Sequence, residues 1–77
     1  MALSALGWIL TDDRRAHRFM DLTGLTPEGL RATITEAGTH RAIFDFLCAH
    51  EPDLLGAADA LGIQPAQLVA AKERLAR

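Results

Sequence analysis

The sequence predicts an all-α fold, a compact bundle of five to six short helices, and three observations support this class. Apolar residues recur every three or four positions, as in Ile43, Phe46 and Leu47, which is the period of one helix face. Glycines followed closely by capping side chains and prolines divide the chain into short helical segments. Alternation of apolar and polar residues, the pattern of a half-buried strand, does not occur.

The first two helices are expected in the N-terminal third of the chain. An apolar run predicts a helix over Ala2–Leu10, which Gly7 weakens because glycine is a poor helix former. Thr11 or Asp12 can cap a second helix, because a short polar side chain accepts a hydrogen bond from a free amide of the first turn. This second helix is expected to run to about Leu22.

A third helix is marked at its start by a cap and a proline. Gly24 ends the second helix, and Thr26 then places a capping hydroxyl just before Pro27, which suits the first helical position. We expect this third helix to run to about Ala37, where Gly38 ends it.

The fourth helix is predicted to lie at the centre of the core. Thr39 is expected to cap it and Pro52 to close it, because a proline disfavours helical geometry in the residue before it. Between them the helix has too many large apolar side chains for one stripe of a surface helix. These side chains are Ile43, Phe44, Phe46 and Leu47.

The last two helices complete the bundle. Asp53 is expected to cap a fifth helix that ends at Gly62, and Pro65 to begin a sixth that runs nearly to the C-terminus. Residues 21–32 and 59–70 align without gaps, each with a helix-ending glycine, an apolar residue and a proline-first helix. Turn geometry shared by tight helix pairs and an internal duplication both explain this correspondence.

The fifth and sixth helices also have the pattern of a helix-turn-helix. This motif needs small and apolar residues where the helices touch and a glycine at the turn. The residues at those places are Ala58, Gly62, Ile63, Leu68 and Ala71. The candidates for DNA contact are Gln67 for a base edge, and Lys72, Arg74, Arg77, Arg14, Arg15 and Arg18 for phosphates. Negative charge lies beside the motif, at Asp45, Glu51, Asp53 and Asp59.

Composition and charge favour a protein partner over nucleic acid. Residues 1–77 are long enough for a single helical domain with one core. The net charge of -2 lacks the basic excess of most nucleic-acid binders, whereas an apolar fraction of 49% leaves apolar surface for a partner or a homodimer. The single cysteine suits a reducing compartment, and Ala2–Leu10 is too short to span a bilayer, so we expect a cytoplasmic protein.

The candidate metal and catalytic residues do not have the spacing in the sequence that such sites require. His50 and Glu51 resemble part of a zinc-protease helix, but the residues that follow lack its second histidine. Cys48 and His50 lie two positions apart and therefore on different helix faces, and no histidine and carboxylate pair is placed to activate the thiol. We expect Cys48 to be a core residue and His50 a partly buried cap at the end of the fourth helix. No catalytic residue, metal, cofactor or small-molecule substrate is predicted.

Trp8 has two interpretations. It is the only tryptophan and lies in an uncharged helix with Leu6 and Ile9. Core packing is the first interpretation. In the second, Trp8, Leu6 and Ile9 anchor a homodimer or a partner protein, since large aromatic side chains dominate the energetics of such interfaces.

Four runs of the sequence resemble a known family. They are residues 6–10 (LGWIL), 19–25 (FMDLTGL), 44–54 (FDFLCAHEPDL) and 58–62 (ADALG). In combination they resemble the small bacterial family called domain of unknown function 3572, over nearly the whole chain. The resemblance implies a stand-alone bacterial cytoplasmic protein of about six short helices, and it implies no activity. We therefore predict a non-enzymatic regulatory or adaptor module that binds protein, with a helix-turn-helix DNA-binding regulator as the alternative.

Overall fold

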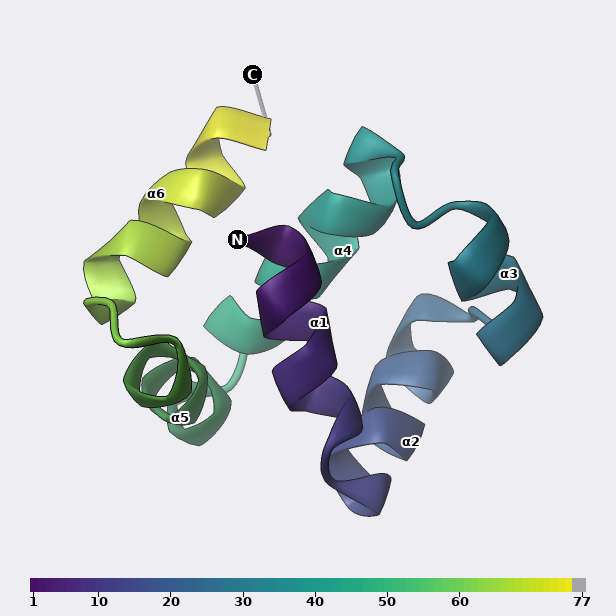
Figure 1. Ribbon diagram of the computed structural model, residues 1–77, viewed down its shortest axis with the longest axis horizontal. Helices are drawn as coiled ribbons and strands as arrows, with labels where there is room; N and C mark the ends of the chain where they lie inside the picture. The colour runs from purple at the N-terminus through teal and green to yellow at the C-terminus, as the bar shows by residue number, and fades with distance from the viewer. Residues whose placement is uncertain (76–77) are drawn as a thin grey trace.

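The computed structural model describes residues 1–75, and these residues form a bundle of helices without strands (Figure 1). This result confirms the all-α prediction. The helices are α1 (Ala2–Leu10), α2 (Asp13–Thr23), α3 (Pro27–Ala32), α4 (Ala37–Cys48), α5 (Glu51–Leu61) and α6 (Pro65–Leu75).

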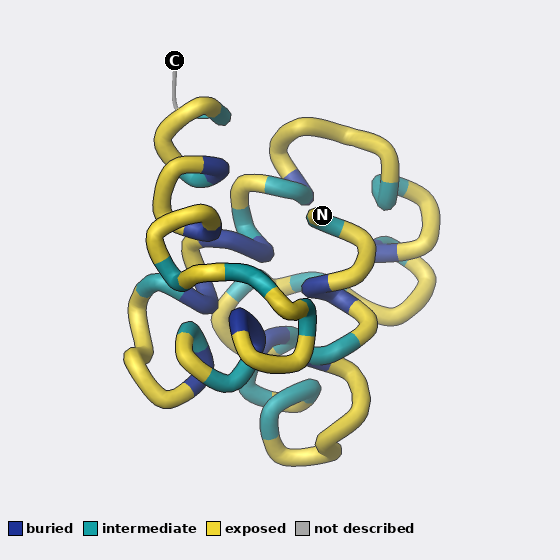
Figure 2. The backbone as a smooth tube through the Cα atoms, turned by 60° about the vertical axis from the view of Figure 1, so that its left-hand side comes forward, coloured by how far each residue is buried: buried dark blue, intermediate teal, exposed yellow. Residues whose placement is uncertain are grey.

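The bundle is a slab of 30 × 29 × 18 Å. Viewed along its shortest axis, α1 lies in front of α4, with α5 and α6 on one side and α2 and α3 on the other (Figure 1). A thickness of 18 Å holds only about two layers of helices, because one helix with its side chains is about 10 Å across. Most helices therefore bury one face and expose the other, as the colouring by burial shows (Figure 2).

The core is built around α4, as its sequence predicts. Helix α4 packs against α1, α2, α5 and α6, and it buries Ile43, Phe44, Phe46 and Leu47. The ring of Phe46 meets the fully buried ring of Phe19 from α2 edge to face, at 5.3 Å between centroids and 87° between planes. This is a favoured arrangement for an aromatic pair.

Both ends of α2 form as predicted. The side chain of Asp12 accepts a hydrogen bond from the backbone N–H of Arg15 at 2.9 Å, so Asp12 is the cap. This bond stabilises the charged carboxylate and thereby lowers the pKa of Asp12. At the other end Gly24 has φ 72°, a left-handed conformation that glycine adopts without strain.

The prediction for the end of α3 and the start of α4 was wrong. Helix α3 ends at Ala32 rather than near Ala37, and α4 begins at Ala37, so Gly38 lies inside α4. The segment after Ala32 is Thr-Ile-Thr, and β-branched side chains disfavour continuation of a helix. Thr39 does not cap α4 but lies within it, buried, and donates a hydrogen bond to the Thr33 hydroxyl at 2.8 Å.

The prediction for the start of α5 also needs correction. Helix α4 ends at Cys48, and Pro52 belongs to the first turn of α5, where a missing N–H costs nothing. Asp53 does not cap α5, because it lies within that helix, where it is buried and pairs with Arg18. His50 is the residue before α5, is exposed, and places Nδ1 3.0 Å from Oδ2 of Asp53.

Among residues 1–75, no single helix has both the length and the apolar composition needed to cross a bilayer. Helices α5 and α6 satisfy those criteria only when they are joined, and the chain bends by 105° between them.

Candidate protein-binding groove

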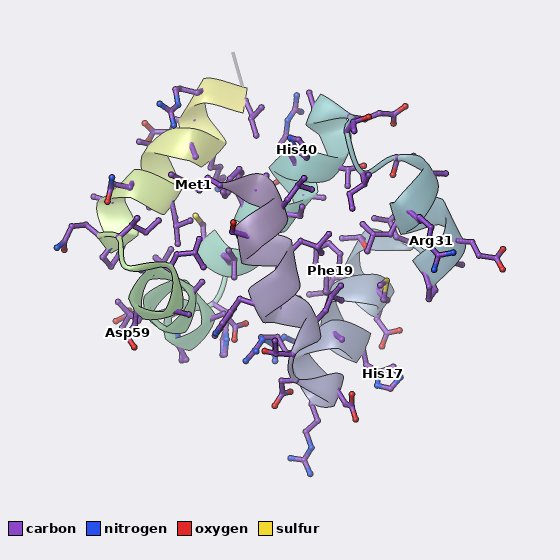
Figure 3. The ribbon with its side chains drawn as sticks, viewed as in Figure 1. Met1, His17, Phe19, Arg31, His40 and Asp59 are labelled. Atoms are coloured by element: carbon purple, nitrogen blue, oxygen red, sulfur yellow. The ribbon has the colours of Figure 1, made fainter. Side chains whose placement is uncertain are left out.

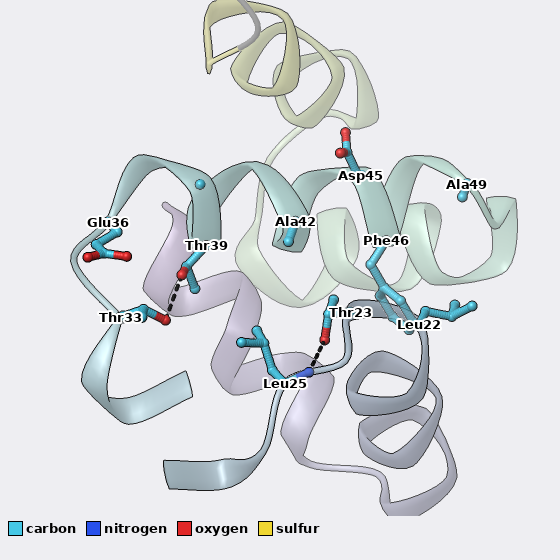
Figure 4. A pocket seen from close by; sticks show the side chains of 11 residues that line it. Leu22, Thr23, Leu25, Thr33, Glu36, Thr39, Ala42, Asp45, Phe46 and Ala49 are labelled. Atoms are coloured by element: carbon cyan, nitrogen blue, oxygen red, sulfur yellow. Dashed lines mark hydrogen bonds between the residues drawn. The ribbon is translucent and has the colours of Figure 1, made fainter. Parts of the chain in front are cut away.

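A groove of about 530 Å³ lies between α4 and the end of α2 (Figure 4). One wall is a face of α4. The other wall is formed by Leu22, Thr23 and Leu25, at the end of α2 and just beyond it. The segment between α3 and α4 closes one end with Thr33 and Glu36. The groove therefore joins parts of the chain that lie far apart in sequence.

The wall from α4 is made mostly of small residues. Gly38, Thr39, Ala42 and Ala49 line it, and Phe46, only 6% exposed, forms the floor. From Gly38 to Ala49, the residue that directly follows α4, the chain rises about 16 Å, or three turns, at about 1.5 Å per residue. Small side chains along that length keep the groove open and allow another backbone to approach α4 closely.

The opposite wall carries the most exposed large apolar side chain among residues 1–75. Leu22 is 71% exposed, whereas Leu25, three residues further on, is half-buried against the core. A lone exposed leucine is common on protein surfaces. At the rim of an apolar groove, however, it adds to a continuous apolar surface, as seen where Leu22 faces Phe46 (Figure 4).

The threonine hydroxyls around the groove donate their hydrogen bonds within the chain. Thr23 donates to the carbonyl of Phe19 at 2.7 Å. Thr39 donates to Thr33 at 2.8 Å, and Thr33 in turn donates to the carbonyl of Gly29 at 3.0 Å. With these donors satisfied, the groove offers mainly apolar contact, which suits a hydrophobic occupant.

The charges that line the groove are negative. Glu36 lies at one end and Asp45 on the rim, and the described residues that line the groove include no Lys, Arg or His. The nearest cation to Asp45 is Lys72, with Nζ 3.8 Å from Oδ1. Both side chains are about half exposed, so water screens this pair and it neutralises the rim only weakly.

Comparison with known protein families identifies a family for this chain. The family described as Protein of unknown function (DUF3572) matches residues 1–77, the whole chain. The chain belongs to this family. No curated protein and no solved structure matches it. The match confirms the resemblance drawn from the sequence.

The structure buries two of the three predicted interaction residues of α1 and leaves the third, Trp8, half-buried. Leu6 and Ile9 are 4% and 0% exposed, so they are core residues and not surface anchors. Trp8 is half-buried, and its indole ring packs against Gly56 of α5, where an added Cβ would lie 2.7 Å from the ring. The guanidinium of Arg15 covers the ring at 3.6 Å from its centroid. These contacts favour the packing interpretation of Trp8.

Two of the arginines predicted to contact phosphates make their contacts with other groups of the same chain. Arg15 donates to the backbone carbonyls of Trp8 and Ile9 at the end of α1, in addition to covering the Trp8 ring. Arg18, whose side chain is 41% exposed, pairs with the buried carboxylate of Asp53, so part of its charge is neutralised within the chain.

The other DNA-contact candidates do not gather on one surface. Gln67 uses its Oε1 to accept the backbone N–H of Gln64 at 2.8 Å, which caps α6. Lys72 faces Asp45, whereas the exposed Arg74 and Arg14 belong to α6 and α2, and these two helices lie on opposite sides of α1 (Figure 1). Arg77 lies outside the described residues.

Side chains capable of metal or thiol chemistry are spread over residues 1–75. These residues contain no group of three His, Cys, Asp or Glu side chains that could hold a metal ion. Cys48 is half-buried, and this burial raises the pKa of its thiol, which lowers the fraction of reactive thiolate. His17, His40 and Asp59 lie far apart around the fold (Figure 3).

Sequence reasoning missed the groove. A signal was present in the spacing of Gly38, Ala42 and Ala49, which lie on one face of a helix and are all small. That spacing did not reveal which element lies opposite, because the end of α2 reaches α4 only in the folded chain.

Proposed function

We propose that this DUF3572 protein is a non-enzymatic binding module that holds one amphipathic helix of a partner protein in the groove between α2 and α4. The observation that carries this proposal is the three-turn stripe of small residues on α4, bordered by the exposed Leu22. Recognition of an amphipathic helix in an apolar groove is a common mode of peptide binding.

The dimensions of the groove suit such a helix. A length of about 16 Å accommodates three turns, over which apolar side chains at positions i, i+4 and i+7 project from one face. The small side chains of Gly38 and Ala42 leave room for the larger ones of the partner. Leu22 and the floor residue Phe46 then provide apolar surface for them to cover.

The charged residues of the groove narrow the class of partner helix. Glu36 and Asp45 disfavour an acidic occupant and favour a helix flanked by Lys or Arg. Complementary charges at the rim of an interface act mainly on specificity and association rate. We therefore expect a helix with an apolar face and basic flanks.

The test places a photo-crosslinking amino acid at position 22 in the native host. The matched control carries it at position 55, because Leu55 is also exposed but lies on α5, outside the groove. We expect a covalent adduct from position 22 and not from position 55, with the attached partner segment a basic amphipathic helix.

A second variant links that adduct to the groove. Ala42→Leu fills the groove and should suppress the adduct, whereas Ala60→Leu, at an exposed site on α5, should not. The proposal fails if position 22 gives no more adduct than position 55, or if the adduct survives Ala42→Leu in a folded protein.

A helix-turn-helix DNA regulator is the second candidate, and the geometry of α5 and α6 favours it. The bend of 105° between them is within the range of about 90–120° for such helix pairs. Gly62 has φ 69° and both Leu68 and Ala71 are buried, as the motif requires. Fluorescence anisotropy with duplex DNA tests this candidate. Binding that weakens with salt and with Lys72→Ala supports it, and no binding at low salt rejects it.

A further inference from the structure

The outer face of α1 has an apolar surface that no other part of residues 1–75 covers. Three of the six exposed large apolar side chains among residues 1–75 lie on α1 or just before it, namely Met1, Leu3 and Leu10. The exposed positions between Leu3 and Leu10 are Ser4 and Gly7, and α1 contains no charged residue. This face is distinct from the buried face that carries Leu6 and Ile9.

We propose that this face of α1 is a dimer interface, occupied by the same face of a second copy of the chain running antiparallel. Leu3 and Leu10 lie at nearly equal distances on either side of the helix centre, next to Gly7. A two-fold axis at that centre brings Leu3 of each copy beside Leu10 of the other. A two-fold interface joins the same surface of both copies, so that surface must be complementary to itself. The pairing of Leu3 with Leu10 meets this requirement.

Gly7 supports the close approach of two helices. An added Cβ at Gly7 would meet nothing within 4 Å, and the residue does not have a positive φ. Within the described part of the chain, neither a turn nor a packing contact therefore requires this glycine, although it weakens the helix by about 1 kcal/mol relative to alanine. A second α1 that crosses at Gly7 would account for this glycine, because the absence of a side chain lets the two helix backbones pack closely.

A hollow beside α1 provides the place into which the second copy fits. It has a volume of about 450 Å³ and is lined mainly by Leu6, Leu10, Met20, Leu30 and Ile34. In the antiparallel arrangement, Leu3 of the second copy lies next to Leu10 and thus at this hollow. Each copy supplies one projecting leucine and one hollow.

The charges also favour a second copy over the basic helix proposed for the groove. The face of α1 is neutral, and the rim of its hollow carries both signs, with Asp13 on one element and Arg31 on another. Two such surfaces can meet without like-charge repulsion. The groove lies on the other side of α4 from α1, which is seen behind α4 in Figure 4, so dimerisation leaves the groove open.

Sedimentation equilibrium over a range of protein concentrations tests the proposal. We expect the natural chain to reach twice the mass of one chain. Leu3→Glu and Leu10→Glu should each raise the dimer dissociation constant at least tenfold. Leu55→Glu is the matched control, because it introduces the same charge at an equally exposed leucine on α5. Circular dichroism confirms that each variant remains folded.

Paired charges test the antiparallel register. The double variant L3K/L10E brings opposite charges together across the two-fold axis and should dimerise more tightly than L3E/L10E, which brings like charges together. The proposal is overturned if the natural chain stays monomeric at millimolar concentration, if Leu55→Glu weakens the dimer as much as Leu3→Glu, or if the two double variants behave alike.

Discussion

Residues 21–32 and residues 59–70 contain the same turn pattern and lead into helices of different length. Gly24 and Gly62 have φ 72° and 69°, so both turns use a left-handed glycine. In the first turn the hydroxyl of Thr26 accepts the backbone N–H three residues later at 3.0 Å. In the second, the side chain of Gln67 accepts the backbone N–H three residues earlier at 2.8 Å. Each turn thus uses one half of a capping box.

The helices that follow differ because of what they bury. Helix α3 has six residues and buries Leu30, whereas α6 has eleven and buries Leu68 and Ala71 in the core. A six-residue helix has too few internal hydrogen bonds to be stable alone, so its length depends on packing. The comparison teaches that turn chemistry sets where a helix starts, and that buried surface sets how far it continues.

The largest expected effect comes from deleting the buried leucine at the equivalent position of each helix. Leu68→Ala should lower the free energy of unfolding by about 3–5 kcal/mol, because Leu68 is fully buried and a cavity remains. Leu30→Ala should cost less, about 2 kcal/mol, because Leu30 borders a hollow that is already open to solvent. Urea unfolding followed by circular dichroism measures both. Equal losses would show that α3 is packed as firmly as α6.

A smaller loss of stability is expected at the two turn glycines, and it should be equal at both sites. Gly24→Ala and Gly62→Ala should each cost about 1–2 kcal/mol, the penalty for a left-handed residue with a Cβ. Neither site has an atom within 4 Å of an added Cβ, so backbone strain acts alone. Gly38→Ala is the control, because Gly38 lies in α4 without positive φ, and there alanine should stabilise by about 0.5–1 kcal/mol. Thermal unfolding would refute the shared geometry if the two turns gave unequal losses.

The smallest effect is expected for the cap of α3. Thr26→Ala removes a bond of a kind worth about 1 kcal/mol, but the loss should remain local because α3 buries little. Amide hydrogen exchange should then quicken in α3 and stay unchanged in α6, with little change in the midpoint of global unfolding. Gln67→Ala is the matched variant at α6, because it removes the side chain that accepts the backbone N–H of Gln64. Faster exchange throughout the chain after Thr26→Ala would mean that α3 does not open separately.

The sequence was sufficient for the fold class and for most helix starts, because caps, prolines and stop glycines act locally. It failed where contacts distant in sequence decide the outcome. The end of α3 depends on Thr33, whose hydroxyl bonds within α3 and to Thr39, and Asp53 was misassigned as a cap because its partner Arg18 lies 35 residues away. These pairings are set by the assembled bundle.

The candidate site was harder to predict than the fold. Helix α1 is apolar on all sides, so its pattern could not separate the buried Leu6 and Ile9 from the exposed Leu3 and Leu10. The groove between α2 and α4 required both walls to be in place. The packing of the whole chain decides which residues stay exposed, and local sequence patterns do not contain that information.

Trp8 is an intrinsic fluorescent probe of this chain. The sequence has one tryptophan and no tyrosine, so intrinsic fluorescence arises almost entirely from one indole. That indole lies between the guanidinium of Arg15 and the backbone at Gly56, where α1, α2 and α5 meet. Its emission follows the separation of those three helices and does not register the opening of α3. Emission and far-ultraviolet ellipticity recorded on the same unlabelled sample would therefore diverge if α3 opens first.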